Sequence, residues 1–420
     1  MKLINTPYFK YKESQLYCEE VPVSEIVRKA GSPVYIYSKK YFTERYNEFN
    51  AAFSEVNHKI FYAVKSNFNL NVINTFNSLG SCFDVNSGGE LYRALKAGVN
   101  PGKIILTGVG KSESEIKEGL EKNLLMIKAE SEEEIYLINE IAAQMNKVAE
   151  VAIRVNPDVD ALTHPYISTG LAENKFGVSP KEALRLYKKQ DELSNVKFTG
   201  IDMHIGSQIT QIQPYFDAVT KLSDLFFEVK KSGINLSHFD IGGGMGVKYN
   251  DEDVFEITQY ADKLIPLFKK IGCEIFFEPG RYFTANAGIL VSKIQYVKLN
   301  NNKYFYIVDA AFNDLMRPSL YGAYHHIQPV VMKDTEDIKV DVVGPICESG
   351  DFLAKKRIIS KMERNEYLAI LSAGSYGMVM SSNYNARRRA PEIMVDGDSY
   401  KVIRSRETYD HLLYDEEKYL

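Results

Sequence analysis

The sequence has few cysteines and no large excess of charge of either sign. The cysteines lie far apart without a CxxC pair, which excludes a zinc knuckle or disulfide framework and favours a reducing cytosol. They are Cys18, Cys82, Cys273 and Cys347. The 420 residues include 51 basic and 55 acidic side chains, for a formal net charge of −4. Without a basic excess, we expect a small-molecule partner rather than nucleic acid or an anionic membrane.

Long apolar runs are also absent. No stretch approaches the roughly 18–20 apolar residues that a membrane-spanning helix requires. Residues 1–7 (MKLINTP) lead into charged and aromatic residues without the apolar centre of a secretory signal. We therefore expect a cytoplasmic protein.

From about residue 59 onward, short β-branched apolar runs alternate with segments of helical periodicity. This alternation predicts βαβ units and a parallel sheet. Eight such units in about 225 residues predict a (β/α)₈, TIM-like barrel. A doubly wound open sheet is the alternative, but no GxGxxG motif opens a helix after a strand here. The expected strands are Lys59–Val64, Cys82–Val85, Lys103–Thr107, Leu124–Lys128, Glu150–Val155, Thr199–His204, Phe239–Ile241 and Glu274–Phe277.

Four segments between these strands carry helix signals. Ser131–Glu134 has the pattern of a capping box before a run with apolar residues at helical spacing. Ser179-Pro180 places proline in a first helical turn and predicts a helix to about Leu193. Residues 213–231 and 254–271 show the same periodicity.

After about residue 286 the pattern changes to short strand-like runs separated by turn residues. These runs are Ile289–Val297, Tyr304–Val308, Ile338–Val343 and Tyr367–Leu371. We expect the barrel over residues 36–285 and a C-terminal all-β domain over residues 286–420. The first 35 residues are also short and strand-like, and we expect them to join the β domain. A short run at Val34–Tyr37 lies outside the set of eight barrel strands.

A lysine closes the first expected barrel strand, in the segment Tyr62-Ala63-Val64-Lys65-Ser66-Asn67. Barrel enzymes place their active sites at the C-terminal ends of the strands. Desolvation there lowers the pKa of a lysine and favours the free amine that forms a Schiff base. A lysine that merely extends from a strand end into solvent is the alternative, and for Lys65 alone it is the commoner case.

The seventh and eighth strands end in Gly242-Gly243-Gly244 and in Glu278-Pro279-Gly280-Arg281. The loops after these two strands form a recurrent phosphate site in barrels. Glycines there let backbone N–H groups approach phosphate oxygens, although a glycine run can also be only a tight turn. Together with Lys65, the pattern favours a phosphorylated aldehyde cofactor, which needs both an amine and a phosphate site.

Two further strand-end residues suit such a cofactor. His204 ends the sixth strand, and its ring can stack on a pyridine face, although a single histidine is more often structural. Glu278 can lie against the pyridine nitrogen, where a carboxylate keeps that nitrogen protonated and the cofactor an electron sink. The alternative for Glu278 is a structural ion pair with Arg281 or Arg154.

The β domain contains a segment that combines a thiol with two carboxylates, Cys347-Glu348-Ser349-Gly350-Asp351. Arg317 supplies a guanidinium that can bind a carboxylate, and Tyr321 and Tyr376 supply phenols. Their spacing alone does not show that these residues meet the barrel.

Together these motifs resemble those of the fold-type III pyridoxal-phosphate decarboxylases, in the same order and over nearly the whole chain. They are Tyr62–Asn67, His204–Ser207, Gly242–Gly244, Glu278–Arg281, Cys347–Asp351 and Tyr384-Asn385. Further segments are similar to the branch of this family that acts on diaminopimelate. These are Tyr166–Gly170, Lys175–Gly177 and Arg317-Pro318.

The resemblance implies a role for each motif residue. Lys65 would hold pyridoxal 5'-phosphate as a Schiff base, His204 would stack on its ring, and Cys347 would be the proton donor. Further cofactor contacts would come from Ser207, Gly244, Glu278, Pro279, Gly280, Arg281 and Tyr376. The far amino-acid end of the substrate would be held by Arg281, Arg317, Tyr321, Glu348 and Tyr376. The family's homodimers build each site from two subunits, with the β domain contributing the Cys347–Glu348 segment across the interface, and no metal is implied.

The implied reaction is the decarboxylation of meso-2,6-diaminopimelate to L-lysine and CO₂, the last step of lysine biosynthesis. A related decarboxylase acting on ornithine, arginine or carboxynorspermidine is the nearest alternative, but a basic substrate would favour acidic groups where Arg281 and Arg317 stand. An alanine-racemase-like enzyme would place an arginine, not Glu278, at the pyridine nitrogen. A non-enzymatic cofactor-binding relative would not need Lys65 and Cys347 together.

Two positions depart from the family pattern. Ser375 stands where alanine usually precedes the tyrosine, and Gly108–Lys111 replaces a loop that more often contains asparagine. The sequence gives no role for either departure.

Overall fold

The computed structural model describes residues 2–161, 169–170 and 174–420. Tyr166–Ser168, in one of the family-like segments, lie outside the described residues. The chain forms two compact units, which we call the barrel unit (45–247 and 253–282) and the sheet unit (1–44, 248–252 and 283–420). The divisions expected from the sequence were after residues 35 and 285. Within the described residues, no helix is long and apolar enough to cross a membrane.

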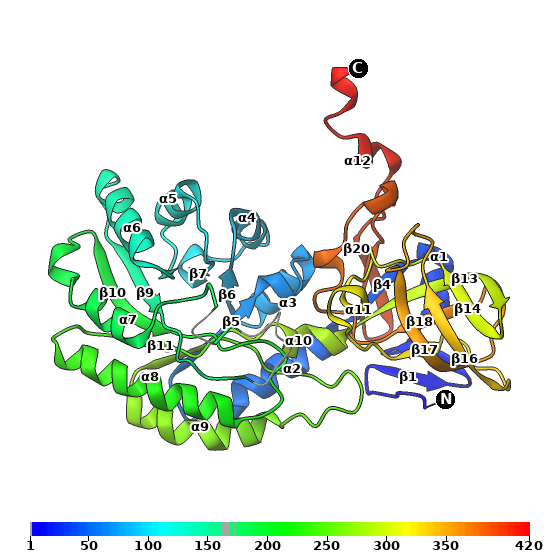
Figure 1. The fold of residues 1–420 in the computed structure, drawn as a ribbon, viewed down its shortest axis with the longest axis horizontal. Helices are drawn as coiled ribbons and strands as arrows, with labels where there is room; N and C mark the ends of the chain where they lie inside the picture. The colour runs from blue at the N-terminus through cyan, green and yellow to red at the C-terminus, as the bar shows by residue number, and fades with distance from the viewer. Residues whose placement is uncertain (1, 162–168, 171–173) are drawn as a thin grey trace. The chain divides into compact units, whose positions relative to one another are not determined.

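The barrel unit contains a closed ring of eight parallel strands, which confirms the predicted fold class (Figure 1). Neighbours in the ring follow chain order, and β12 closes it by pairing with β5. Each strand overlaps one of the eight predicted apolar runs. The strands are β5 (His58–Ala63), β6 (Cys82–Val85), β7 (Ile104–Leu106), β8 (Met126–Ala129), β9 (Ala149–Arg154), β10 (Val196–Asp202), β11 (His238–Asp240) and β12 (Glu274–Phe277).

Helices connect successive barrel strands, and Figure 1 shows α4–α9 around the outside of the ring. Their apolar residues face the strands, which explains the helical periodicity of the sequence. The helices that follow or connect the barrel strands are α3 (Leu70–Ser78), α4 (Gly88–Lys96), α5 (Glu113–Lys122), α6 (Glu132–Gln144), α7 (Pro180–Tyr187), α8 (Gln213–Lys231), α9 (Ile257–Ile271) and α10 (Arg281–Thr284). α2 (Lys39–Ala52) precedes the first strand.

Two local predictions about these helices were wrong. Ser131 caps α6 through the backbone N–H of Glu134, but the Glu134 carboxylate accepts from the Glu130 N–H, so the reciprocal half of a capping box is missing. The helix after Ser179 ends at Tyr187 instead of near Leu193. The side-chain amide of Gln190 donates to the Val196 carbonyl and accepts from the Phe198 N–H, both in β10. These bonds are made by residues that have already left the helix.

The barrel interior is layered along the strands. Its apolar layer consists of Phe61, Cys82, Ile105, Met126, Ala152 and Phe276, all buried. Side chains alternate across a strand, so the residue two positions further along points to the same side. On four strands that residue is charged: Asp84 follows Cys82, Lys128 follows Met126, Arg154 follows Ala152, and Glu278 follows Phe276. A charged layer therefore lies at the C-terminal ends of the strands.

The sheet unit contains a nine-stranded sheet, most of it antiparallel, whose main path runs β17-β16-β14-β13-β4-β19-β20. Residues from the start of the chain complete it, because β4 pairs with both β13 and β19. Its strands are β4 (Val34–Ser38), β13 (Gly288–Asn300), β14 (Lys303–Val308), β15 (Ile327–Pro329), β16 (Asp337–Val343), β17 (Phe352–Ser360), β18 (Tyr367–Ile370), β19 (Glu392–Asp396) and β20 (Ser399–Arg404).

The first residues of the chain form a separate small sheet within the same unit. It is three-stranded and antiparallel, with β1 (Phe9–Lys12), β2 (Gln15–Cys18) and β3 (Val21–Pro22). The remaining helices of the unit are α1 (Val23–Ala30), α11 (Arg317–Tyr321) and α12 (Tyr409–Leu413).

Candidate active site

Lys65 lies just beyond the end of β5, in a 3₁₀ turn over Val64–Ser66. The Tyr62 hydroxyl holds this turn by donating to the Asn67 carbonyl at 2.7 Å. The Lys65 side chain is 37% exposed, and its Nζ lies 3.9 Å from Oδ2 of the buried Asp84. The other Asp84 oxygen, Oδ1, is buried with no hydrogen-bond partner among the described residues. An amine that solvent can reach therefore lies beside a carboxylate at the C-terminal end of the barrel.

The glycine loop after β11 approaches its neighbours too closely for any side chain. A Cβ at Gly243 would lie 2.1 Å from the Glu278 carbonyl oxygen, and one at Gly244 would lie 2.2 Å from the Gly206 carbonyl oxygen. Gly244 also has φ +95°, a conformation that L side chains rarely adopt. The glycine run is therefore required by packing and not only by a tight turn.

His204 is tied to the same loop. The backbone N–H of Gly243 donates to His204 Nδ1 at 3.2 Å, so the ring proton of the neutral imidazole lies on Nε2. Burial, followed by the positive charges of Lys65 and Arg154, lowers the pKa of His204 well below its usual value. The imidazole is therefore neutral at neutral pH.

The segment after β12 places a cation beside a hydroxyl. Arg281 opens α10 and is buried, and its Nη2 donates to Ser207 Oγ at 3.1 Å. Gly280 packs against Ser66, where a Cβ would lie 3.0 Å from the Ser66 Cβ. The Pro279 carbonyl accepts from the N–H of Ala63. The structure thus brings the loops after β5, β10 and β12 together.

Glu278 makes neither of the structural pairs considered from the sequence. Its carboxylate forms an ion pair with Lys128, while Arg154 pairs with Glu130 at 3.0 Å. Lys128 Nζ also contacts Asp202 Oδ1 at 2.7 Å and Asp240 Oδ2 at 2.6 Å. The three carboxylates lie close enough to surround one cation, and the Lys128 ammonium is that cation.

Lys128, Asp202 and Asp240 were missed from the sequence. Asp202 and Asp240 end their strands and Lys128 is the last but one residue of β8, and all three are buried. Lys128 was counted only as the last residue of an apolar run. The available signal was its position two residues after the core residue Met126, which places both side chains on one side of the strand.

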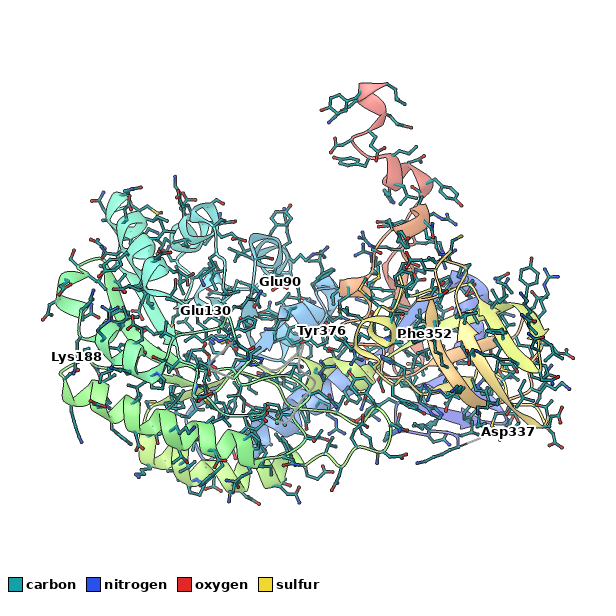
Figure 2. The ribbon with its side chains drawn as sticks, in the orientation of Figure 1. Glu90, Glu130, Lys188, Asp337, Phe352 and Tyr376 are labelled. Carbon is teal, nitrogen blue, oxygen red and sulfur yellow. The ribbon has the colours of Figure 1, made fainter. Side chains whose placement is uncertain are left out.

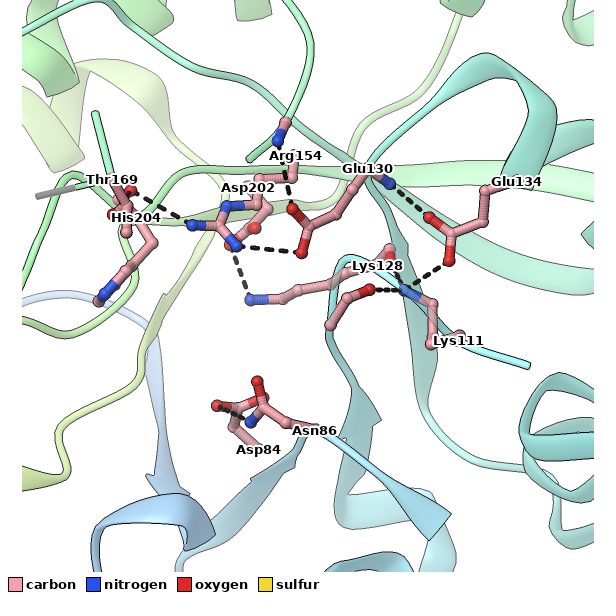
Figure 3. A network of polar contacts seen from close by, with 12 residues as sticks. Asp84, Asn86, Lys111, Lys128, Glu130, Glu134, Arg154, Thr169, Asp202 and His204 are labelled. Atoms are coloured by element: carbon pink, nitrogen blue, oxygen red, sulfur yellow. Dashed lines mark hydrogen bonds and ion pairs between the residues drawn. The ribbon is translucent and has the colours of Figure 1, made fainter. Parts of the chain in front are cut away.

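Two other polar contacts hold the rim around this cluster (Figure 3). The Arg154–Glu130 pair is covered by the ring of Phe176, 4.8 Å from the guanidinium, and Glu130 also accepts from the N–H of Gly177. Lys111, in the atypical loop, is buried and donates to the carbonyl of Lys128 at 2.6 Å. These contacts give the Lys175–Gly177 motif and the Gly108–Lys111 loop a structural role.

The remaining predicted site residues belong to the sheet unit. Arg317 opens α11 and is buried, with its guanidinium 4.5 Å from the Tyr249 ring centroid and its Nη1 3.0 Å from His325 Nε2. His325 Nδ1 lies 2.8 Å from the Leu371 carbonyl and donates to it, which leaves Nε2 as the acceptor for Arg317. Tyr321 closes the same helix, so α11 presents an arginine and a phenol together.

The thiol segment lies in an exposed loop of the same unit. Cys347 and Glu348 are both exposed, and the Tyr384 hydroxyl donates to Glu348 Oε1 at 2.5 Å. This contact joins two of the family-like motifs. Tyr376, labelled in Figure 2, has φ +54°, and the preceding Ser375 is fully buried with its hydroxyl unpartnered among the described residues.

Comparison with known proteins identifies the family. A family model described as the pyridoxal-binding domain of pyridoxal-dependent decarboxylases matches residues 39–285. A diaminopimelate decarboxylase from Aquifex aeolicus is 46% identical over 408 residues, 97% of each chain. The chain belongs to the diaminopimelate decarboxylase family. A relative of that name from Haemophilus influenzae is 47% identical over 407 residues, 96% of this chain and 98% of its own.

A solved structure extends the similarity to three dimensions. The diaminopimelate decarboxylase from Helicobacter pylori, complexed with L-lysine, has a TM-score of 0.91 and 38% identity. The alignment covers 94% of this chain and all of that one. The family predicted from the ordered motifs is thereby confirmed, and with it a pyridoxal-phosphate-dependent carboxy-lyase.

Proposed function

We propose that this chain catalyses the pyridoxal-phosphate-dependent decarboxylation of meso-2,6-diaminopimelate to L-lysine and CO₂. The observation that carries the proposal is Lys65, an accessible amine beside Asp84 at the mouth of a barrel in a chain of this family. L-lysine, the product of this reaction, is the ligand in the Helicobacter pylori structure. The proposed reaction is a step of lysine biosynthesis.

The residues at the barrel mouth fit the cofactor. Lys65 would bind its aldehyde carbon, and the side-chain-free loop at Gly244 would admit its phosphate to backbone N–H groups. Arg281 and Ser207 offer further donors to an anion, and Gly280 and Pro279 shape the loop that carries them. When bound, the cofactor supplies an electron-withdrawing ring that accepts the electrons left by the departing CO₂.

Two residues of the barrel are suited to the ring of the cofactor. His204 presents a neutral imidazole, whose position is fixed by the Gly243 N–H, and we assign it to the ring face. A neutral ring adds no positive charge beside the cofactor. Glu278 is assigned to the ring nitrogen, where its carboxylate would hold a proton on that atom.

Residues of the sheet unit would bind the other end of the substrate and handle the proton. Arg317, with Tyr321 on the same helix, would bind the carboxylate that is retained, and Glu348 and Tyr376 would complete this site. A substrate with a second carboxylate would form a charge-assisted hydrogen bond with the guanidinium that L-lysine and L-ornithine cannot form, which gives selectivity against these two amino acids. The exposed Cys347 thiol is assigned to deliver a proton to the carbon that has lost CO₂.

We further propose that the enzyme is a cytoplasmic homodimer in which each site takes Cys347 and Glu348 from the partner subunit. Cytoplasmic location is supported by the free state of all four cysteines. A shared site is supported by the exposure of the Cys347–Glu348 segment.

Covalent attachment of the cofactor tests the assignment of Lys65. Borohydride reduction of the loaded protein, followed by peptide mapping, should label Lys65 and no other lysine. Lys65→Arg should remove the label, whereas Lys189→Arg, which changes a partly exposed lysine paired with Glu132, should retain it. A label on any other lysine of the wild-type protein would overturn the assignment.

A further inference from the structure

The charged layer of the barrel contains a lysine whose role the proposed reaction leaves unexplained. Lys128 Nζ is completely buried and contacts three carboxylates from three successive strand ends. These belong to Asp202, Asp240 and Glu278, which are themselves at most 5% exposed. Of the three, only Glu278 has a proposed role toward the cofactor.

The cluster carries more negative than positive charge. One ammonium faces three carboxylates. A fourth carboxylate, that of Asp84 on β6, also acts electrostatically on Lys128 and Glu278. Burial, with the charges of Asp240 and Asp84, raises the pKa of Glu278 well above its usual value, and the Lys128 charge opposes this rise. Burial likewise raises the pKa of Asp240 to about 6, again against the effect of Lys128. Lys128 is therefore the group that favours ionised carboxylates in this cluster.

Stability alone is a weak explanation for these four groups. Replacing a buried ion cluster by apolar residues of similar volume is often neutral or stabilising, because the desolvation cost disappears. The layer immediately below, which includes Met126 and Phe276, shows that apolar residues pack well inside this barrel. A lysine at position 128 thus has a consequence that a methionine would lack, namely a positive charge against Glu278.

We propose that Lys128 is a positioning residue that holds one oxygen of Glu278 and keeps this carboxylate ionised, so that Glu278 meets the ring nitrogen of the cofactor as an anion. The inference rests on the proposed function, because it assigns a support to the residue at that nitrogen. Asp202 and Asp240 in turn hold the ammonium in place. Lys128 acts through Glu278 and is not itself a catalytic residue.

The charge-removing variant Lys128→Met tests this proposal. An opposite charge within about 4–6 Å lowers a carboxyl pKa by roughly 1–3 units, so its removal should raise the pKa of Glu278 by about 1 unit or more. Glu278 must be ionised for activity, so the acid limb of the kcat–pH profile should move to higher pH by that amount. The pH titration of the cofactor absorbance in the resting enzyme should move in the same direction.

Lys111→Met is the matched control. Lys111 is also buried and ion-paired, with Glu134 at 2.7 Å, but its ammonium does not contact Glu278. The control should cost stability without moving either titration. The double variant Lys128→Met/Asp240→Asn removes one carboxylate along with the lysine, and it should move both titrations back toward wild type. A purely structural role predicts no such recovery.

Several outcomes would overturn the inference. Lys128→Met could leave both titrations unchanged, or Lys111→Met could move them as far. If neither Lys128 variant folds, Glu278→Gln decides: it should abolish the acid limb, and a retained limb would show that Glu278 does not set it. Borohydride labelling separates this result from failure of the proposed function. If Lys65 is labelled in wild type and in Lys128→Met, the cofactor assignment stands whichever way the titrations move.

Discussion

The most specific structural requirement at the proposed phosphate site is the absence of a side chain at Gly244. A Cβ at this position would lie 2.2 Å from the Gly206 carbonyl oxygen and 3.0 Å from the Tyr215 hydroxyl. The carbonyl belongs to backbone and the hydroxyl is fixed by donation to the Gly243 carbonyl at 2.9 Å, so neither can move aside cheaply. Gly244→Ala should therefore displace the loop that we assign to the cofactor phosphate.

The size of the effect follows from two contributions. A non-glycine residue in the left-handed region costs about 1–2 kcal/mol. Forcing an extra methyl group into a packed site costs roughly 1–3 kcal/mol more. Gly233 separates the two, because its φ of +92° nearly equals that of Gly244 while nothing lies within 4 Å of its Cβ position. Gly233→Ala should therefore show the backbone cost alone, and Gly244→Ala should lose about 2–5 kcal/mol of unfolding free energy.

Chemical denaturation of both cofactor-free variants, with titration of pyridoxal phosphate followed by absorbance, measures both effects. Gly244→Ala should bind the cofactor at least about tenfold more weakly, which corresponds to about 1.4 kcal/mol. Gly233→Ala should bind it as the wild type does. Equal stability losses in the two variants, with unchanged cofactor affinity in Gly244→Ala, would refute the packing argument.

Three further predictions concern the substrate, the dimer and pH. Arg317→Met should lose roughly 2–5 kcal/mol of transition-state binding for diaminopimelate, measured as kcat/KM, but much less for a mono-carboxylate substrate such as L-lysine; equal losses would make Arg317 structural. Lys65→Ala and Cys347→Ala proteins should each be nearly inactive, yet after subunit exchange recover about a quarter of wild-type activity, because half of the dimers then hold one intact site; no recovery after proven exchange would exclude a shared site. Burial and nearby positive charge lower the pKa of His204 in the folded protein below its usual 6.5. As the pH falls below 6.5, the unfolded chain therefore binds more protons than the folded protein, and the free energy of unfolding should decrease. His204→Gln should reduce this loss in acid denaturation, and an unchanged pH dependence would contradict it.

The barrel could be predicted because its strands are short, apolar and regularly separated by helices. Residues such as Ile104–Leu106 are buried on both sides, and buried parallel strands read as continuous apolar runs. The sheet unit was harder, because β17 and β20 carry several exposed charged residues and lack a continuous apolar run. Pairing between β4 and β13 joins residues about 250 positions apart, and no local pattern predicts such a pairing.

The residues of the candidate site also fall into two groups, those that short motifs predict and those that they do not. Lys65, His204, Gly244 and Glu278 could be proposed from the sequence because each follows the end of a barrel strand in a recognisable motif. Lys128 was not found, because its partners come from three other strands and meet it only when the barrel closes. Short motifs predict which residues face the barrel mouth, whereas the charge balance between strands depends on the closed structure.

The central claim is tested most directly by the release of CO₂ from purified, cofactor-loaded protein. The assay compares meso-2,6-diaminopimelate with L-lysine, L-ornithine and L-arginine, with Lys65→Ala as the inactive control. The proposed function predicts one CO₂ and one L-lysine for each diaminopimelate consumed, and far slower turnover of the three amino acids that lack a second carboxylate. Preferred turnover of one of those three amino acids, or no turnover of diaminopimelate by protein that carries the cofactor on Lys65, would contradict it.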